Sequence, residues 1–205
     1  MQSRAILLRA SFAGISPLDR CDHYMGIMSL PLARTPREAH LYIDMHACAC
    51  GERGTDQRSH STLAGKTYWA GRYDLTCTGC GAERRFIFRV PDWPLSVDGY
   101  GGDSPSEIID AGQWIWLADL AASSCAAQPS PDEEERRLRV EAMEEAVRAM
   151  EEILKFIPGR EPIAPDTAFW TPEGRAIRDR EPGRFRRPRL EVVLNSYRGS
   201  SDGLR

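Results

Sequence analysis

The chain has 205 residues, of which 41% are hydrophobic and 28% charged, and this balance excludes a disordered protein and an integral membrane protein. Its longest apolar stretch, at about 114–122, is far shorter than the roughly 20 residues that cross a bilayer, so we expect no membrane span. The net charge of -3 gives no overall attraction to nucleic acid. The N-terminus lacks a clean apolar core and a cleavage site for secretion, and we predict a cytoplasmic protein.

The first part of the chain differs from the rest. Residues 1–39 are predicted to form an N-terminal extension that is weakly ordered over 1–27, because Met28 and the sequence after it would make an ordinary start of a chain. Cys21 and His23 lie in this extension, and we do not expect either to bind a metal.

Residues 40–92 have the pattern of a small sheet. Apolar and polar residues alternate at 40–46 and again at 83–90, and 67–76 is rich in aromatic and β-branched residues, so we predict three strands. The polar stretch 51–61 is predicted to be a loop. Prolines after position 90 end the last strand, and 93–103 has the Pro and Gly content of a linker.

Four of the six cysteines fall into two close pairs, Cys48 with Cys50 and Cys77 with Cys80, separated by 26 residues. A glycine follows each pair, as expected for a tight turn that directs backbone N–H groups at sulfur and needs a residue tolerant of positive φ. Four thiolates form the closed tetrahedral set typical of structural zinc. Disulfides are less expected, because disulfide frameworks occur in shorter, cysteine-richer secreted chains. The sequence therefore predicts one structural Zn²⁺ ion.

On these residues the segment at about 40–91 resembles the zinc-ribbon class, in which two cysteine-bearing turns clamp a metal beneath a small antiparallel sheet. The resemblance departs in the first turn, where the class has two residues between the cysteines and this chain has only Ala49. His46, two residues before Cys48, is therefore an alternative ligand in place of Cys48 or Cys50.

Three enzymatic interpretations fit less well. A thioredoxin-like redox pair at Cys77 and Cys80 needs a helix after its first cysteine, whereas 83–90 has a strand pattern. A zinc deaminase needs a His-x-Glu motif and a proline before the second cysteine pair, and both are missing here. A hydrolytic zinc site uses histidine or carboxylate ligands, but the histidines of this segment do not have helical spacing.

The second half of the chain is predicted to be helical over 104–198, with a tail at 199–205. A capping box at 104–107 predicts a short helix near 105–110, and the apolar run 113–122 fits a buried strand or a short helix. A second capping box at 130–133 and an apolar stripe predict a long helix that ends at Pro158. Two further helices are predicted, one from Thr171 and one near Pro188. The apolar stripe of the long helix either packs in the core of the chain or forms the contact of a dimer, so the oligomeric state stays open.

Seven arginines lie within the fifteen residues from Arg175 to Arg189. They could bind phosphate or an acidic partner, together with arginines of the predicted sheet, or they could pair with the nine carboxylates of the segment 132–152. The candidate binding residues are Arg84, Arg85, Arg184, Arg186, Arg187 and Arg189.

Together these features predict an α+β protein in which a zinc-ribbon-like domain at 40–92 precedes the helical domain. The function that we expect is binding of a protein partner without catalysis, as an adaptor or an inhibitor, including an inhibitor of the bacterial immunity type. A nucleic-acid-binding protein that uses the cluster Arg175–Arg189 is the alternative, and a zinc-dependent enzyme is a third, weaker interpretation.

Overall fold

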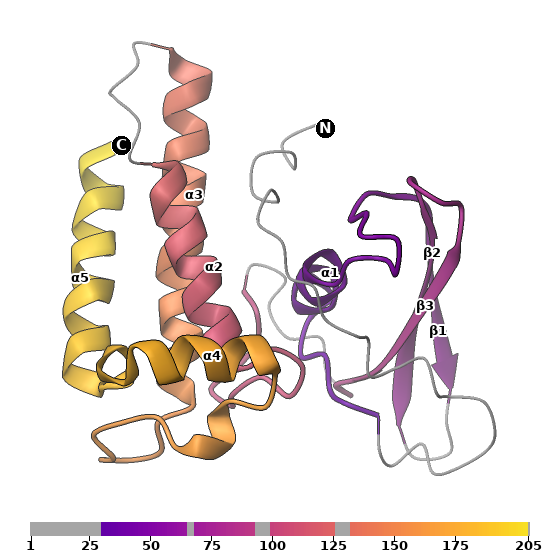
Figure 1. Cartoon of the computed structure of the whole chain (residues 1–205). Helices are drawn as coiled ribbons and strands as arrows, with labels where there is room; N and C mark the ends of the chain where they lie inside the picture. The colour runs from indigo at the N-terminus through magenta and orange to yellow at the C-terminus, as the bar shows by residue number, and fades with distance from the viewer. Residues whose placement is uncertain (1–29, 65–67, 93–98, 126–131, 205) are drawn as a thin grey trace. The chain divides into compact units, whose positions relative to one another are not determined.

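The computed structural model describes residues 30–64, 68–92, 99–125 and 132–204, and the predicted α+β class is confirmed (Figure 1). The described residues form two compact units. The sheet unit comprises 30–102 and 106–108, and the helical unit comprises 103–105 and the chain from 109 onward. No described helix is both long and apolar enough to cross a membrane. The extension 1–27, with Cys21 and His23, lies outside the described residues.

The sheet unit contains helix α1 (Pro36–Met45) and the strands β1 (Thr55–Ala64), β2 (Trp69–Cys77) and β3 (Glu83–Val90). The strands form an antiparallel sheet in the order β1-β2-β3, so β2 is central.

The prediction of a strand at 40–46 is wrong, because residues 40–45 belong to α1 and His46 is its C-cap. Thr35 accepts a hydrogen bond from the Glu38 N–H at 3.1 Å, and Pro36 occupies the first turn, so the helix has a well-formed start upstream of the apparent alternation. The buried residues Ala39, Tyr42 and Ile43 follow helical spacing. Alternation over seven residues was too short a pattern to distinguish the two structures.

The predicted loop at 51–61 is also partly wrong, because β1 begins at Thr55. This strand is polar and largely exposed, and it pairs with β2 from Thr55↔Cys77 to Ala64↔Trp69. Its structure comes from hydrogen bonds to β2 rather than from a buried face, so it lacks the apolar alternation that marks strands in a sequence.

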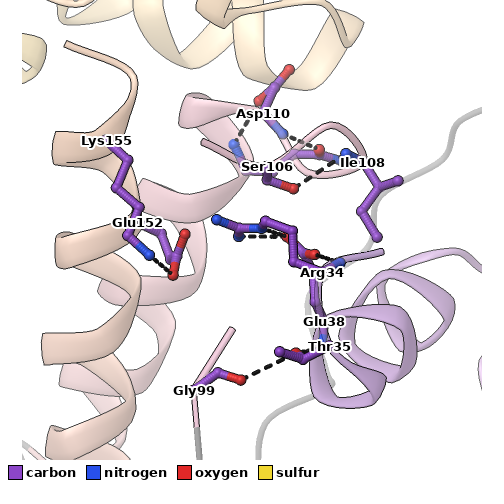
Figure 2. A network of polar contacts seen from close by, with 10 residues as sticks. Arg34, Thr35, Glu38, Gly99, Ser106, Ile108, Asp110, Glu152 and Lys155 are labelled. Atoms are coloured by element: carbon purple, nitrogen blue, oxygen red, sulfur yellow. Dashed lines mark hydrogen bonds and ion pairs between the residues drawn. The ribbon is translucent and has the colours of Figure 1, made fainter. Parts of the chain in front are cut away.

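Helix α1 packs on one face of the sheet through aromatic side chains. The Tyr42 ring meets Phe86 and Phe88 edge to face, with centroids 6.2 and 5.4 Å apart, and Tyr73 contributes to the same buried group. At the start of α1 a buried ion pair joins Arg34 and Glu38, with Nε donating to Oε1 at 3.0 Å (Figure 2). The helix is thereby anchored at its start and along its length.

The helical unit contains α2 (Ala111–Ser124), α3 (Glu133–Lys155), α4 (Pro172–Arg180) and α5 (Arg187–Leu204), with short 3-10 turns η2 (Asp166–Ala168) and η3 (Pro182–Phe185). Helix α3 packs against both α2 and α5, and α4 crosses near one end of α2 (Figure 1). The core of this unit consists largely of residues that are less than 3% exposed, among them Trp114, Ile115, Ala118, Ala146, Met150, Ile153 and Leu190. The apolar stripe of α3 predicted from the sequence therefore faces this core.

The first and last residues of the helices agree with the sequence-based prediction in some places and differ in others. The predicted helix at 105–110 is wrong: α2 begins after Asp110, which forms a capping box with Gln113. The cap of α3 is Asp132, and Thr171 caps α4 as predicted. Helix α3 ends at Lys155, before Pro158, and α5 continues through 199–204.

Asp110 also ties two helices together. Its Oδ1 accepts a hydrogen bond from the Gln113 N–H at 2.8 Å, and its Oδ2 accepts from the N–H and the hydroxyl of Thr171 at 2.8 and 2.6 Å. One buried carboxylate thus caps α2 and holds the start of α4. Burial raises the pKa of Asp110, and these donors partly oppose that rise. A side chain at Gly174 would collide with this carboxylate, since an added Cβ would lie 2.2 Å from Oδ1.

Candidate metal centre

The four cysteines lie on two turns of the sheet unit. Cys48 and Cys50 follow α1, whereas Cys77 ends β2 and Cys80 precedes β3. The glycines after each pair have positive φ, +89° at Gly51 and +71° at Gly81, which confirms the conformation predicted for both.

Each turn is closed by two backbone hydrogen bonds. In the first turn Gly51 N–H donates to Cys48 O at 2.8 Å, and Cys48 N–H donates to Glu52 O at 2.7 Å. In the second turn Gly81 N–H donates to Cys77 O at 2.9 Å, and Cys77 N–H donates to Ala82 O at 2.9 Å. The first turn has one residue between its cysteines and the second has two. The first turn is therefore shorter, but the same two kinds of backbone hydrogen bond close it.

The two turns also pack tightly against each other. Thr78 N–H donates to Gly54 O at 3.1 Å, which joins the second turn to the segment after the first. A Cβ added at Gly54 would lie 2.4 Å from Thr78 Oγ1, and one added at Gly79 would lie 2.9 Å from Glu52 Cβ. Small residues at these positions let the two pairs of sulfurs approach each other.

The sulfur atoms are spaced for one ion. Cys48 Sγ lies 3.7 Å from Cys80 Sγ, Cys50 Sγ lies 3.6 Å from Cys77 Sγ, and all four sulfurs lie within 4.8 Å of one another. Four thiolates at about 2.3 Å from a tetrahedral zinc ion would be about 3.8 Å apart. The four cysteines can therefore hold a metal ion with little rearrangement.

The electrostatic environment of the two cysteines in the second turn differs. The Cys80 N–H, with a further donor at Gly79, lowers the pKa of Cys77 to about 7, against burial that would raise it. At Cys80 the Ala82 N–H lowers the pKa, but the neighbouring sulfurs of Cys50, Cys48 and Cys77 outweigh it and raise the pKa to about 12. Four sulfurs so close together cannot all be thiolates without a cation, which is the role that a metal ion fills.

His46 is not part of this group. It follows α1, and its Nδ1 lies 2.7 Å from the carbonyl oxygen of Tyr42. In the described part of the chain the four cysteines form the one group of three or more side chains suited to bind a metal. Cys125 lies in the helical unit, half-buried, with its thiol near Ala121 O at 3.4 Å. The sulfur ligands predicted from spacing are thus brought together without a histidine.

Two arginines connect the cysteine turns to α1. Arg84 donates to His46 O at 2.8 Å, and Arg53 donates to Met45 O at 3.3 Å, so both satisfy carbonyl groups at the end of the helix. Sequence reasoning overlooked Arg53. The available signal was its position, since each arginine follows a Cys-Gly pair within a few residues.

The candidate binding arginines have different environments. In the sheet unit, Arg84 binds the end of α1 and Arg85 pairs with Asp74 at 2.7 Å. In the helical unit, Arg184 forms two hydrogen bonds with Asp119 at 2.8 and 2.6 Å, and Arg187 donates to Ile157 O at 2.7 Å, just after α3.

Arg186 and Arg189 are exposed. The alternative prediction, that the cluster pairs with the acidic segment 132–152, is wrong for the described residues, where Arg178 pairs with Asp166 and Arg184 with Asp119. Several of those carboxylates pair with arginines of α3 itself, such as Glu134 with Arg137 and Glu145 with Arg148.

Comparisons with protein-family models, curated proteins and solved structures found no match for this chain.

Proposed function

We propose that Cys48, Cys50, Cys77 and Cys80 hold one zinc ion and that its role is structural. The observation that carries this proposal is the convergence of four sulfurs within 4.8 Å from two turns closed by backbone hydrogen bonds. A tetrahedral set of four sulfurs suits zinc or iron. The short sulfur–sulfur distances favour a single ion, because an iron–sulfur cluster would place several atoms between the thiolates.

The ligand set supports a structural role over a catalytic one. Catalytic zinc keeps a coordination position for water or substrate, whereas four protein thiolates complete the tetrahedron. A unit of this size has a small hydrophobic core, and metal binding adds directly to its folding free energy. The ion would fasten the ends of α1, β2 and β3, which all meet at the two turns.

For the whole chain we propose a non-enzymatic binding protein that acts on a protein partner, as an adaptor or an inhibitor. The arginine environments support a protein over nucleic acid. Arg84, Arg184 and Arg187 donate hydrogen bonds within their own units, so fewer cations are available for phosphate contacts than the sequence suggested. The net charge of -3 points the same way.

The metal is tested on the purified full chain. We expect one zinc per chain by elemental analysis and four sulfur ligands at about 2.3 Å by X-ray absorption. Iron, or a nitrogen or oxygen ligand, would overturn the zinc assignment. For the partner class, we expect weak retention on heparin that does not depend on Arg186 and Arg189, and a stoichiometric complex with a protein that persists after nuclease treatment. Strong, salt-dependent retention lost in R186Q/R189Q would favour nucleic acid instead.

A further inference from the structure

The face of the sheet opposite α1 carries two arginines that share one carboxylate. Arg72 and Asp74 lie on β2 and Arg85 lies on β3. Arg72 Nε lies 2.6 Å from Asp74 Oδ2, and Arg85 Nε lies 2.7 Å from Asp74 Oδ1. Glu83 and Arg84 also line this part of the surface and add one charge of each sign, so three arginines and two carboxylates leave a surplus of one positive charge.

The strand register places these side chains together. Asp74 pairs with Ser59 of β1 on one side and with Arg85 on the other, so the three side chains form a row across the sheet. The intervening pair, Tyr73 with Phe86, is buried on the side of α1. The row is therefore on the opposite face, together with Arg72, two residues before Asp74.

This face is hollowed. A depression of about 590 Å³ is lined by Arg72, Asp74 and Arg85 and by the hydroxyl residues Ser59 and Thr76, with Glu83 and Arg84 also contributing. The Arg85 side chain is 55% exposed and the Arg72 side chain 34%, so a ligand can reach both guanidinium groups.

Both arginines retain donors for a ligand. Arg85 contacts Asp74 through Nε, and its two terminal nitrogens have no partner in the part of the chain that the structure describes. Arg72 donates to the same carboxylate through Nη2 at 3.1 Å, while its Nε lies close to Asp74 Oδ2 without the geometry of a hydrogen bond, and Nη1 has no partner among the described residues. Asp74 holds the planes of both guanidinium groups in place, and Arg72 and then Arg85 lower its pKa, so it stays ionised at neutral pH. Orientation by a shared anion reduces the entropy that ligand binding would cost.

We propose that this depression binds one carboxylate of an acidic segment on the protein partner. The proposal rests on the proposed function and specifies which part of the surface the partner contacts. A single surplus positive charge matches a singly charged carboxylate, and guanidinium groups bind carboxylates through paired N–H donors. Ser59 and Thr76 supply hydroxyl donors beside the two arginines.

The test follows the Arg Nε–H resonances of the zinc-loaded full chain by NMR during titration with a peptide of six glutamates. We expect the peptide at millimolar concentration to shift the resonances of Arg72 and Arg85. R85Q should weaken binding by about tenfold or more, since charged hydrogen bonds are lost. R85K keeps the positive charge but lacks the paired N–H donors of a guanidinium group, so it should weaken peptide binding less than R85Q. R89Q is the matched control, because Arg89 is on the same strand and pairs with Glu107.

The outcomes separate this inference from the proposed function. Zinc content and the backbone spectrum of R85Q show whether that variant is folded, and R85K provides a second test if it is not. Absence of shifts at Arg72 and Arg85, or tighter binding of inorganic phosphate or a single-stranded oligonucleotide at the same residues, would overturn the inference. A protein partner whose affinity is unchanged by both R72Q and R85Q would also overturn it, while leaving the proposed function intact. A chain without zinc would overturn the metal assignment whatever the peptide does.

Discussion

Cys50 Sγ and Cys77 Sγ lie 3.6 Å apart, although the two residues are separated by β1 and most of β2 in the sequence. This contact closes the sheet unit at one end, because Cys50 precedes the hairpin of β1 and β2 and Cys77 ends it. A metal ion bound there links segments whose loop-closure entropy must otherwise be offset by packing alone.

Replacing Cys77 with serine is expected to release the metal and to lower the stability of the sheet unit by several kcal/mol. Structural zinc contributes roughly 10 kcal/mol or more to small metal-dependent folds, and a lost thiolate removes much of that. Elemental analysis and thermal melting of the full chain measure both effects. The control is C125S, because Cys125 belongs to the helical unit and is not a member of the group of four sulfurs. If C77S melted like the parent and kept as much metal, the site assignment would be wrong.

Removal of the metal with a chelator is expected to act on one unit selectively. Hydrogen exchange measured by mass spectrometry should accelerate in β2 and β3, which adjoin the second cysteine turn. Loss of the metal lowers the free energy of their local unfolding. Exchange in α2 and α3 should stay close to that of the metal-loaded protein, since neither helix carries one of the four ligands. Equal acceleration in all four elements would contradict a role confined to the sheet unit.

Gly81→Ala is expected to destabilise the protein by about 1 kcal/mol and to weaken metal binding, because a Cβ disfavours the left-handed conformation. Apart from its chain neighbours, no described residue lies within 4 Å of a Cβ added there, so the cost comes from the backbone at φ +71°. Gly199→Ala is the matched control. It lies on α5 with open space around it and should stabilise the helix by roughly 0.5 to 1 kcal/mol. Denaturant unfolding measures the change in stability of both variants, and a competitive zinc titration measures the change in metal affinity. If both substitutions stabilised the protein, or both destabilised it, the role given to the positive φ of Gly81 would be wrong.

Asp110→Ala is expected to cost about 2 to 4 kcal/mol in the helical unit. The variant loses a helix cap, worth about 1 kcal/mol, and leaves donors of the buried Gln113 and the half-buried Thr171 without their acceptor. Asp132→Ala removes the cap of α3, where the aspartate is exposed, and should cost only about 1 kcal/mol. Equilibrium unfolding of both variants gives the comparison, and equal losses would show that Asp110 acts as a cap alone.

Features set by short stretches of chain could be predicted from the sequence. The cysteine pairs with their following glycines predicted the turns, the positive φ at Gly51 and Gly81 and the convergence of the four cysteines, because each turn is specified by a few consecutive residues. The cap at Thr171 was equally local. The class, with a small antiparallel sheet followed by helices, followed from strand and helix patterns in the two halves.

Only the tertiary structure decided the features that depend on distant partners. Strand β1 is polar and is a strand because β2 lies beside it. Residues 40–45 are helical, and Tyr42 of this helix packs on the rings of Phe86 and Phe88. The arginines show the same limit: Arg184 pairs with Asp119, 65 residues away, and Arg84 with the end of α1, 38 residues away. Periodicity reports which residues are buried or exposed along one element, whereas the partner of a strand edge or of a charge is set by elements brought together only in the folded chain.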